Sequence, residues 1–178
     1  FGLNPQECGD EVQKYCTEIK RGLKLYSQPN MYKQEIIITE HMTDEQINRL
    51  HYTCDCLVNP SHGEGWSMPS FDALGFANWP ICTGGTAMDD FVIDGENGFL
   101  VDSYESPSFG VMDTFDFLQT GRENWREIDI ASLKECMRIV YKNKHQYWTE
   151  KRKLGLSKHL EKFSYAKIGE SLKVALES

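Results

Sequence analysis

The sequence predicts an α/β fold, with a parallel sheet that has helices on both faces and a helical C-terminus. Three observations support this prediction. Between residues 35 and 101, short apolar runs alternate with segments that carry helix signals, which is typical of a parallel sheet. The runs are apolar throughout, as expected of strands covered on both faces. After residue 129, three consecutive segments have helical spacing.

The N-terminal part predicts one helix and one strand. Apolar residues recur at helical spacing between residues 7 and 25, at Val12, Tyr15, Cys16, Ile19 and Leu23. This spacing predicts an amphipathic helix that ends before Pro29 and Asn30. The β-branched run at residues 35–39 is typical of a buried parallel strand.

The next segment predicts a helix, a strand and a second helix. Thr43 and Gln46 have the spacing of a capping box, which predicts a helix over residues 44–53. An apolar strand is expected at residues 56–58. After a turn, a helix is expected with Pro69 in its first turn, where a missing N–H costs no hydrogen bond.

The sheet is expected to continue with strands at residues 81–83 and 99–101. Between them, a Gly84-Gly85 turn precedes a short helix from about Ala87, and a glycine-containing turn covers residues 94–98.

Residues 103–128 are predicted to be an irregular excursion, since they contain Pro107, two glycines and many aromatic residues. The chain then closes with helices near residues 130–144, 146–160 and 164–177. Trp125 is expected to pack against these last helices.

Composition excludes some classes of protein. The 178 residues carry 19 Lys and Arg against 27 Asp and Glu, a formal net charge of −8. This balance argues against nucleic acid as a main partner, since a phosphate backbone requires a clustered basic face. The sequence contains no run of 18 apolar residues, so no membrane span is predicted. The first residues show no pattern of a signal peptide. The cysteine content, interpreted as reduced thiols, predicts a cytoplasmic location.

The six cysteines are expected to be reduced, mostly buried thiols without a metal. None forms a Cys-x-x-Cys pair. Cys54 and Cys56 fall on the same side of a predicted strand, which is poor geometry for zinc. A chain of this length with this apolar content does not need a disulfide framework.

Acidic residues flank the turn that follows the second predicted strand. This stretch, HGEGWSMPSFDAL, covers residues 62–74 and contains Glu64 and Asp72. The first turn of the following helix offers free N–H groups that favour an anion, while carboxylates accept hydrogen bonds from hydroxyls. A nucleotide sugar, with phosphates between two hydroxylated rings, satisfies both requirements. The alternative is that both acids are solvated surface residues.

In order along the chain, these features resemble the donor-binding half of the GT-B glycosyltransferases, the large retaining group labelled "glycosyl transferases group 1". The strand that ends in Pro60-Ser61 is followed by Glu64-Gly65, Pro69, Asp72, a Gly84-Gly85 turn and the segment DGENGFLV. The resemblance is continuous from about residue 35 to 102 and weaker from 122 to 178. It implies a Rossmann-like sheet, the C-terminal lobe of a GT-B fold, within a single domain at residues 1–178.

The resemblance also implies roles for individual residues. Glu64 would face the hydroxyls of the transferred sugar as the catalytic residue, and Asp72 would bind the ribose. The segment from Gly65 to Met68 would bring the backbone of Gly65, Trp66, Ser67 and Met68 close to the sugar and diphosphate. The loop at His41 and Met42 would hold the nucleobase.

The sequence departs from the family pattern in several places. Asp72 is one methylene shorter than the usual Glu, and Trp66-Ser67 replaces a usual Phe-Gly, which would narrow the sugar pocket. The phosphate-binding Arg and Lys of the family fall before residue 1, and the basic residues Lys20, Arg21 and Lys24 do not replace them. The acceptor-binding N-terminal lobe is also missing. The chain is therefore expected to be one lobe of a two-lobed enzyme, inactive alone.

The expected reaction is transfer of a hexose from a UDP-, GDP- or ADP-sugar to an acceptor, with retention and without metal or cofactor. The sequence contains no Asp-x-Asp motif, the usual metal-binding device of the other large glycosyltransferase class. Two alternatives remain open: a non-catalytic nucleotide-sugar-binding module, and a sugar epimerase with the GT-B fold.

Two further features have two interpretations each. His62 either borders the sugar site or is a solvated loop residue. The Gly84-Gly85-Thr86 segment forms either a second anion-facing turn or a plain helix-opening turn that requires small residues.

Overall fold

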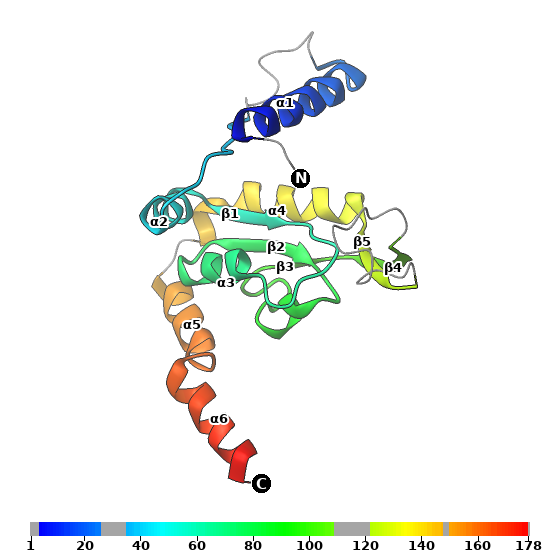
Figure 1. Cartoon of the computed structure of the whole chain (residues 1–178). Coiled ribbons are helices and arrows are strands. Elements are labelled where there is room, and N and C mark those ends of the chain that lie inside the picture. The colour runs from blue at the N-terminus through cyan, green and yellow to red at the C-terminus, as the bar shows by residue number, and fades with distance from the viewer. Residues whose placement is uncertain (1–3, 26–34, 109–121, 148–149, 178) are drawn as a thin grey trace. The chain divides into compact units, whose positions relative to one another are not determined.

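The computed structural model describes residues 4–25, 35–108, 122–147 and 150–177. The chain divides into two compact units, residues 1–47 and 48–178, and their elements are labelled in Figure 1. Of the helices in the described residues, none has the length and apolar character needed to cross a bilayer.

The N-terminal unit contains helix α1 (Pro5–Gly22) and the start of helix α2 (Asp44–Thr53). Both begin with a capping box. In α1, the Asn4 side chain accepts from the Glu7 N–H at 3.0 Å, and the Asn4 N–H donates to the Glu7 carboxylate at 2.8 Å. In α2, Thr43 and Gln46 exchange the same pair of bonds. Both predicted helices are therefore confirmed, with their starts fixed by side-chain caps.

The strand predicted at residues 35–39 is wrong. This segment has no strand assignment and pairs with no strand of the described residues. Ile36 is 88% exposed, so the β-branched run is not buried within its own unit. β-branched composition describes a residue that fits a pleated, half-buried surface, and it does not supply a neighbouring strand. The segment is instead tied to α1 by an ion pair from Lys20 to Glu35, whose hydrogen bond holds the pKa of Glu35 below its ordinary value.

The second unit is built on a three-stranded parallel sheet, which confirms the predicted fold class. Strands β1 (Cys56–Asn59), β2 (Trp79–Thr83) and β3 (Phe99–Val101) lie in the order β1-β2-β3. Val58 is paired with Ile81 in the register of β1 and β2. All five residues of the central strand are buried, as the apolar runs predict for a strand covered on both faces.

Alternate residues of β2 face two separate cores. Trp79 and Ile81 pack with Val101 of β3 and with Val140 of helix α4 (Ile130–Tyr147). Cys82 packs on the opposite side, where helices α3 (Met68–Gly75) and α5 (Glu150–Glu161) lie. Figure 1 shows α4 and α3 on the two sides of the sheet. The predicted arrangement of helices on both faces is therefore confirmed.

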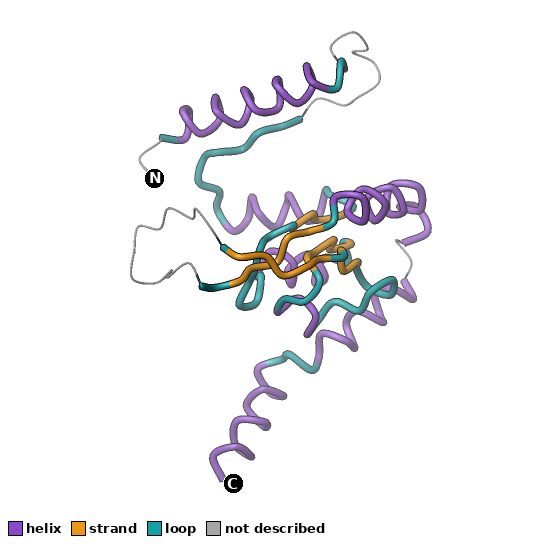
Figure 2. The backbone as a smooth tube through the Cα atoms, turned by 90° about the vertical axis from the view of Figure 1, so that its right-hand side faces the viewer, coloured by secondary structure: helices purple, strands orange, loops and turns teal. Residues whose placement is uncertain are grey.

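The excursion predicted at residues 103–128 is wrong at both of its ends. Strands β4 (Ser103–Pro107) and β5 (Asn124–Ile128) form an antiparallel hairpin, which lies near the end of the sheet where β2 and β3 finish (Figures 1 and 2). Pro107 is the last residue of β4, where a missing N–H interrupts no central ladder. The hairpin connection, which holds Phe109, Phe115 and Phe117, lies outside the described residues.

The remaining elements lie close to the positions that the sequence predicts. The short helix expected near Ala87 is a 3₁₀ helix, η2 (Ala87–Asp90). Helix α6 (Tyr165–Glu177) completes the helical C-terminus and buries none of its residues. The second unit therefore places its strand ends, the hairpin and the start of α3 within one compact body.

Candidate functional site

The turn between β1 and α3 is shaped by a left-handed residue at its end. Ser67 has a φ of 65°, a conformation that glycine adopts without strain and that other residues rarely adopt. Its buried hydroxyl accepts from the Asn59 amide at 2.8 Å and donates to Ser70 at 2.8 Å. These hydrogen bonds join the last residue of β1 to the first turn of α3. They fix the two ends of the turn that carries Glu64.

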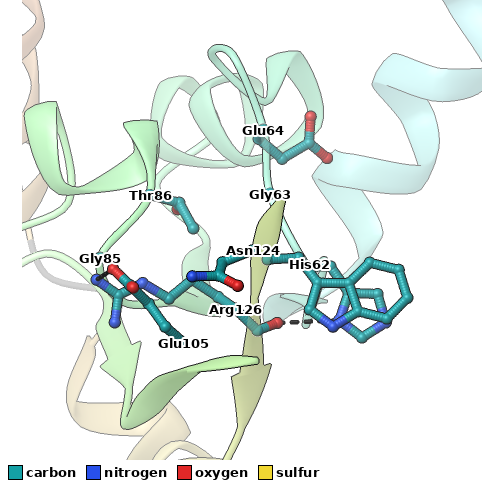
Figure 3. A pocket seen from close by; sticks show the side chains of 9 residues that line it. His62, Gly63, Glu64, Gly85, Thr86, Glu105, Asn124 and Arg126 are labelled. Atoms are coloured by element: carbon teal, nitrogen blue, oxygen red, sulfur yellow. Dashed lines mark hydrogen bonds and ion pairs between the residues drawn. The ribbon is translucent and has the colours of Figure 1, made fainter. Parts of the chain in front are cut away.

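Glu64 lies exposed in this turn and lines a pocket. Its carboxylate lies 3.5 Å from the side-chain amide of Asn59. The pocket has a volume of about 310 Å³, shown in Figure 3. It is lined by residues of three segments: His62, Gly63, Glu64, Gly85, Thr86, Glu105, Asn124, Trp125 and Arg126. The pocket thus combines the Glu64 turn, the loop after β2 and the hairpin.

Strand β5 is docked onto the Glu64 turn through His62. The Arg126 N–H donates to the His62 carbonyl at 2.9 Å, and the His62 Nδ1–H donates to the Arg126 carbonyl at 2.9 Å. The His62 ring stacks on Trp125 with ring centroids 4.0 Å apart. The stack of Trp125 on His62 was not predicted from the sequence. His62 lines the pocket and its side chain is 49% exposed; whether it borders a sugar stays a prediction.

Arg126 is the pocket residue that sequence reasoning missed. Its guanidinium lies against Gly85, where a Cβ atom would come within 2.7–2.9 Å of Cζ, Nε and Nη2. Its Nη2 lies 3.8 Å from the Glu105 carboxylate. Glu105 and Asn124 were missed with it, because the hairpin was expected to be irregular. The sequence signal was weak, because NWREI has no regular alternation of polar and apolar residues.

In the loop after β2, the Gly85 amide has its hydrogen-bond partner within the chain. The Gly85 N–H donates to both carboxylate oxygens of Asp89 at 3.0 Å. Gly85 has a φ of 76°, which favours glycine. Its amide therefore already binds an anion, the Asp89 carboxylate of η2. Of the two interpretations of Gly84-Gly85-Thr86, the helix-opening turn describes this segment.

The Trp66 side chain does not narrow the pocket. Its ring packs in the core with Phe71, Phe91 and Phe163, with ring centroids 5.1–5.3 Å apart. Trp66 is therefore not among the residues that line this pocket, and its role at the sugar stays a prediction. These ring contacts attach the turn that carries Glu64 to the core below α3.

The other predicted site residues lie near the pocket or in the other unit. Asp72 is half-buried in α3, and among the described residues no hydrogen bond or ion pair engages its carboxylate. Gly65, Ser67 and Met68 belong to the same turn but do not line the pocket. His41 and Met42 belong to the N-terminal unit, and their part in nucleobase binding stays a prediction.

A buried thiol lies below the turn. Cys82 donates to the Ser70 hydroxyl at 3.3 Å, and burial raises its pKa from 9.0 to about 11. All six cysteines are free thiols, but the expectation that most of them are buried is wrong, because Cys82 is buried and the other five are half-buried. In the described residues no cluster of three or more His, Cys, Asp or Glu side chains is arranged to hold a metal ion.

We expect Cys82 to be alkylated last of the six cysteines in the folded protein. At about pH 8 its thiolate fraction is near one in a thousand, and the side chain is fully buried. Iodoacetamide labelling followed by peptide mass spectrometry measures the order. Since an unfolded chain ionises this thiol at a lower pH than the folded one, stability is expected to fall as pH rises from 9 towards 11. Rapid labelling of Cys82 without unfolding contradicts this expectation.

Comparison with known proteins identifies the family. A search of curated proteins and a search of solved structures each gave no match. A family model described as "Glycosyl transferases group 1" matches residues 18–110. The match covers just over half of the chain and includes the three strands of the sheet, Glu64 and Asp72. The chain therefore belongs to the group 1 glycosyltransferase family.

Proposed function

We propose that this chain is the donor-binding domain of a two-lobed glycosyltransferase that uses a nucleotide-diphospho-sugar. The observation that carries the proposal is the position of Glu64. It lies beyond the carboxyl end of β1, in the wall of a pocket and within the segment matched by the family model. In open α/β sheets, ligands bind beyond the carboxyl ends of the strands. A domain of this kind is expected to span residues 1–178 and to require an N-terminal lobe for the acceptor.

The proposed roles follow from the chemistry of each group. Glu64 accepts hydrogen bonds from hydroxyls of the transferred hexose, and its exposure leaves its carboxylate accessible to a ligand. The backbone from Gly65 to Met68, at the start of α3, faces the diphosphate, because the first turn of a helix favours an anion. Asp72 accepts from the ribose hydroxyls, and His41 and Met42 border the nucleobase.

The reaction proposed is hexose transfer with retention of configuration and without a metal. The bond between the anomeric carbon and the diphosphate oxygen breaks as the acceptor oxygen forms the new glycosidic bond. The acceptor hydroxyl gives up its proton to the departing nucleoside diphosphate. A cytoplasmic location is proposed with it, since nucleotide sugars are the donors.

We expect the wild-type chain to bind one of the three series UDP-hexose, GDP-hexose or ADP-hexose in ligand-observed NMR. Glu64→Ala and Asp72→Ala should each weaken that binding by at least about tenfold, because each removes charge-assisted hydrogen bonds to hydroxyls. Glu96→Ala is the matched control, since Glu96 is an exposed acid in the turn before β3. Binding that survives in the Glu64, Asp72 double variant would place the site elsewhere.

A second measurement separates a transferase from a non-catalytic module. A two-lobed protein that includes this chain is incubated with the donor that binds, and release of nucleoside diphosphate is followed with and without Glu64→Gln. Turnover that depends on Glu64 supports the transferase, while donor binding without turnover in the two-lobed protein supports the module.

A further inference from the structure

The hairpin brings a permanently charged cation into the Glu64 pocket. Strand β5, which carries it, lies wholly outside the segment matched by the family model. Of the residues that line the pocket, Arg126 is the one whose side chain carries a positive charge at every physiological pH. The remaining charged groups there are the carboxylates of Glu64 and Glu105, so the pocket presents hydrogen-bond acceptors and one strong donor.

The position of Arg126 is fixed through the backbone. Two hydrogen bonds of 2.9 Å join Arg126 to His62, two residues before Glu64. Both use backbone atoms of Arg126, so they do not depend on its side chain. The strand that carries the guanidinium is therefore hydrogen-bonded to the turn that carries the Glu64 carboxylate. Figure 3 shows the guanidinium beside Gly85 and Glu105, apart from the Glu64 carboxylate.

The guanidinium has hydrogen-bonding capacity left for a ligand. Its contact with Glu105 is 3.8 Å, beyond the 2.7–2.9 Å that is usual for a charge-assisted hydrogen bond. The Glu105 side chain is 64% exposed, so water screens this pair. An arginine offers five N–H donors. A long, screened ion pair with Glu105 leaves most of them available to a ligand in the pocket.

Gly85 makes room for the guanidinium. A Cβ atom at this position would overlap the guanidinium at 2.7–2.9 Å. The Gly85 amide is occupied by Asp89, so the loop itself has no open amide there. An anion that enters this end of the pocket therefore meets the guanidinium of Arg126 rather than the backbone.

We infer that Arg126, in addition to the backbone at the start of α3, binds anionic oxygens of the donor's diphosphate, while Glu64 binds hydroxyls of the donor. The inference rests on the proposed function and names a substrate-binding residue that the family match does not include. A guanidinium pairs with phosphate oxygens in a bidentate geometry that suits a diphosphate. A pocket with the Glu64 carboxylate at one end, and at the other a guanidinium that is only loosely paired with Glu105, fits a hydroxylated molecule that carries phosphate.

The test is isothermal titration calorimetry of the 178-residue chain with inorganic pyrophosphate, with the three nucleotide hexoses and with a neutral methyl hexoside. The variants are Arg126→Gln and Arg126→Lys, with Arg138→Gln as the matched control. Arg138 is an exposed arginine of α4 that pairs with Glu135, away from the pocket.

We expect Arg126→Gln to weaken pyrophosphate and donor binding by at least about tenfold, since it removes a charged hydrogen-bond donor. Arg126→Lys should retain part of the affinity, because it keeps the charge but loses the fork. Arg138→Gln and the neutral hexoside should show no change. Should Arg126→Gln lose its fold by circular dichroism, Glu105→Gln carries the test, because removal of the competing carboxylate should strengthen pyrophosphate binding severalfold.

The other outcomes separate the two proposals. Donor binding that is lost in Glu64→Ala and unchanged in Arg126→Gln overturns this inference and leaves the proposed function standing. Pyrophosphate binding that depends on Arg126, without binding of any nucleotide hexose, supports the anion site and overturns the proposed function. If the wild-type chain binds neither pyrophosphate nor any nucleotide hexose, the proposed function and the anion site are both overturned. An unchanged pyrophosphate affinity in Glu105→Gln overturns the anion site.

Discussion

Replacement of Phe91 with alanine is expected to lower the free energy of unfolding by about 3–5 kcal/mol, the usual cost of emptying a buried aromatic site. Phe91 is fully buried in the core below α3. Its ring packs edge-on against Phe71 at 5.4 Å and against Trp66 at 5.1 Å. The cavity would lie directly beneath the turn that carries Glu64, so donor affinity should fall together with stability.

Urea unfolding followed by circular dichroism measures this effect. Tyr165→Ala is the control, because Tyr165 is 100% exposed at the start of α6 and its truncation removes no core contact. An unfolding free energy of Phe91→Ala within about 1 kcal/mol of the wild type would show that this core is not packed as described.

Gly98→Ala is expected to destabilise the protein by about 1–3 kcal/mol through overpacking. A Cβ atom at Gly98 would come within 2.7 Å of the Pro80 carbonyl oxygen and 2.8 Å of Pro80 Cγ and Val92 Cγ1. The first of these is backbone of the central strand, which cannot move aside as a flexible side chain can. Because the clash lies between β2 and the turn that leads into β3, the sheet itself must shift.

The matched control is Gly75→Ala at the end of α3. An added Cβ there would meet no atom within 4 Å, and the φ of Gly75 is not in the left-handed region. Thermal or urea unfolding measures both variants. Because each substitution removes the same backbone freedom from the unfolded chain, the difference between their unfolding free energies reports the overpacking at Gly98. Equal stability of the two variants contradicts the close approach of Gly98 to β2.

The parts of the fold that were predicted correctly depend on local signals. The capping box at Thr43, Pro69 in the first turn of α3 and the apolar strand at Ile81 each carry their own evidence in a few neighbouring residues. The parts that were wrong depend on pairing. The run at Ile36 has strand composition but pairs with no strand in the described residues, whereas β5 has weak composition and a partner in β4. Composition cannot state which segments will meet.

The same distinction applies to the candidate site. Glu64 was found from sequence because its turn, with neighbouring glycines and Pro69, is a local pattern. Arg126 was missed because it reaches the pocket through hydrogen bonds to His62, which lies 64 positions earlier. The core packing of Trp66 was not predicted, because it depends on Phe91 and Phe163, which lie far along the chain.

The bonds between His62 and Arg126 also set the order in which the domain can assemble. A contact across 64 residues closes late, because the entropy lost in loop closure must be offset by other contacts already formed. During synthesis, the three parallel strands are complete once Val101 has left the ribosome, but β5 follows more than twenty residues later. The two cores that cover the sheet also require Val140 of α4 and Leu156 of α5, which follow β5 in the chain. The packed sheet and the finished pocket are therefore expected to form together, after most of the domain has left the ribosome.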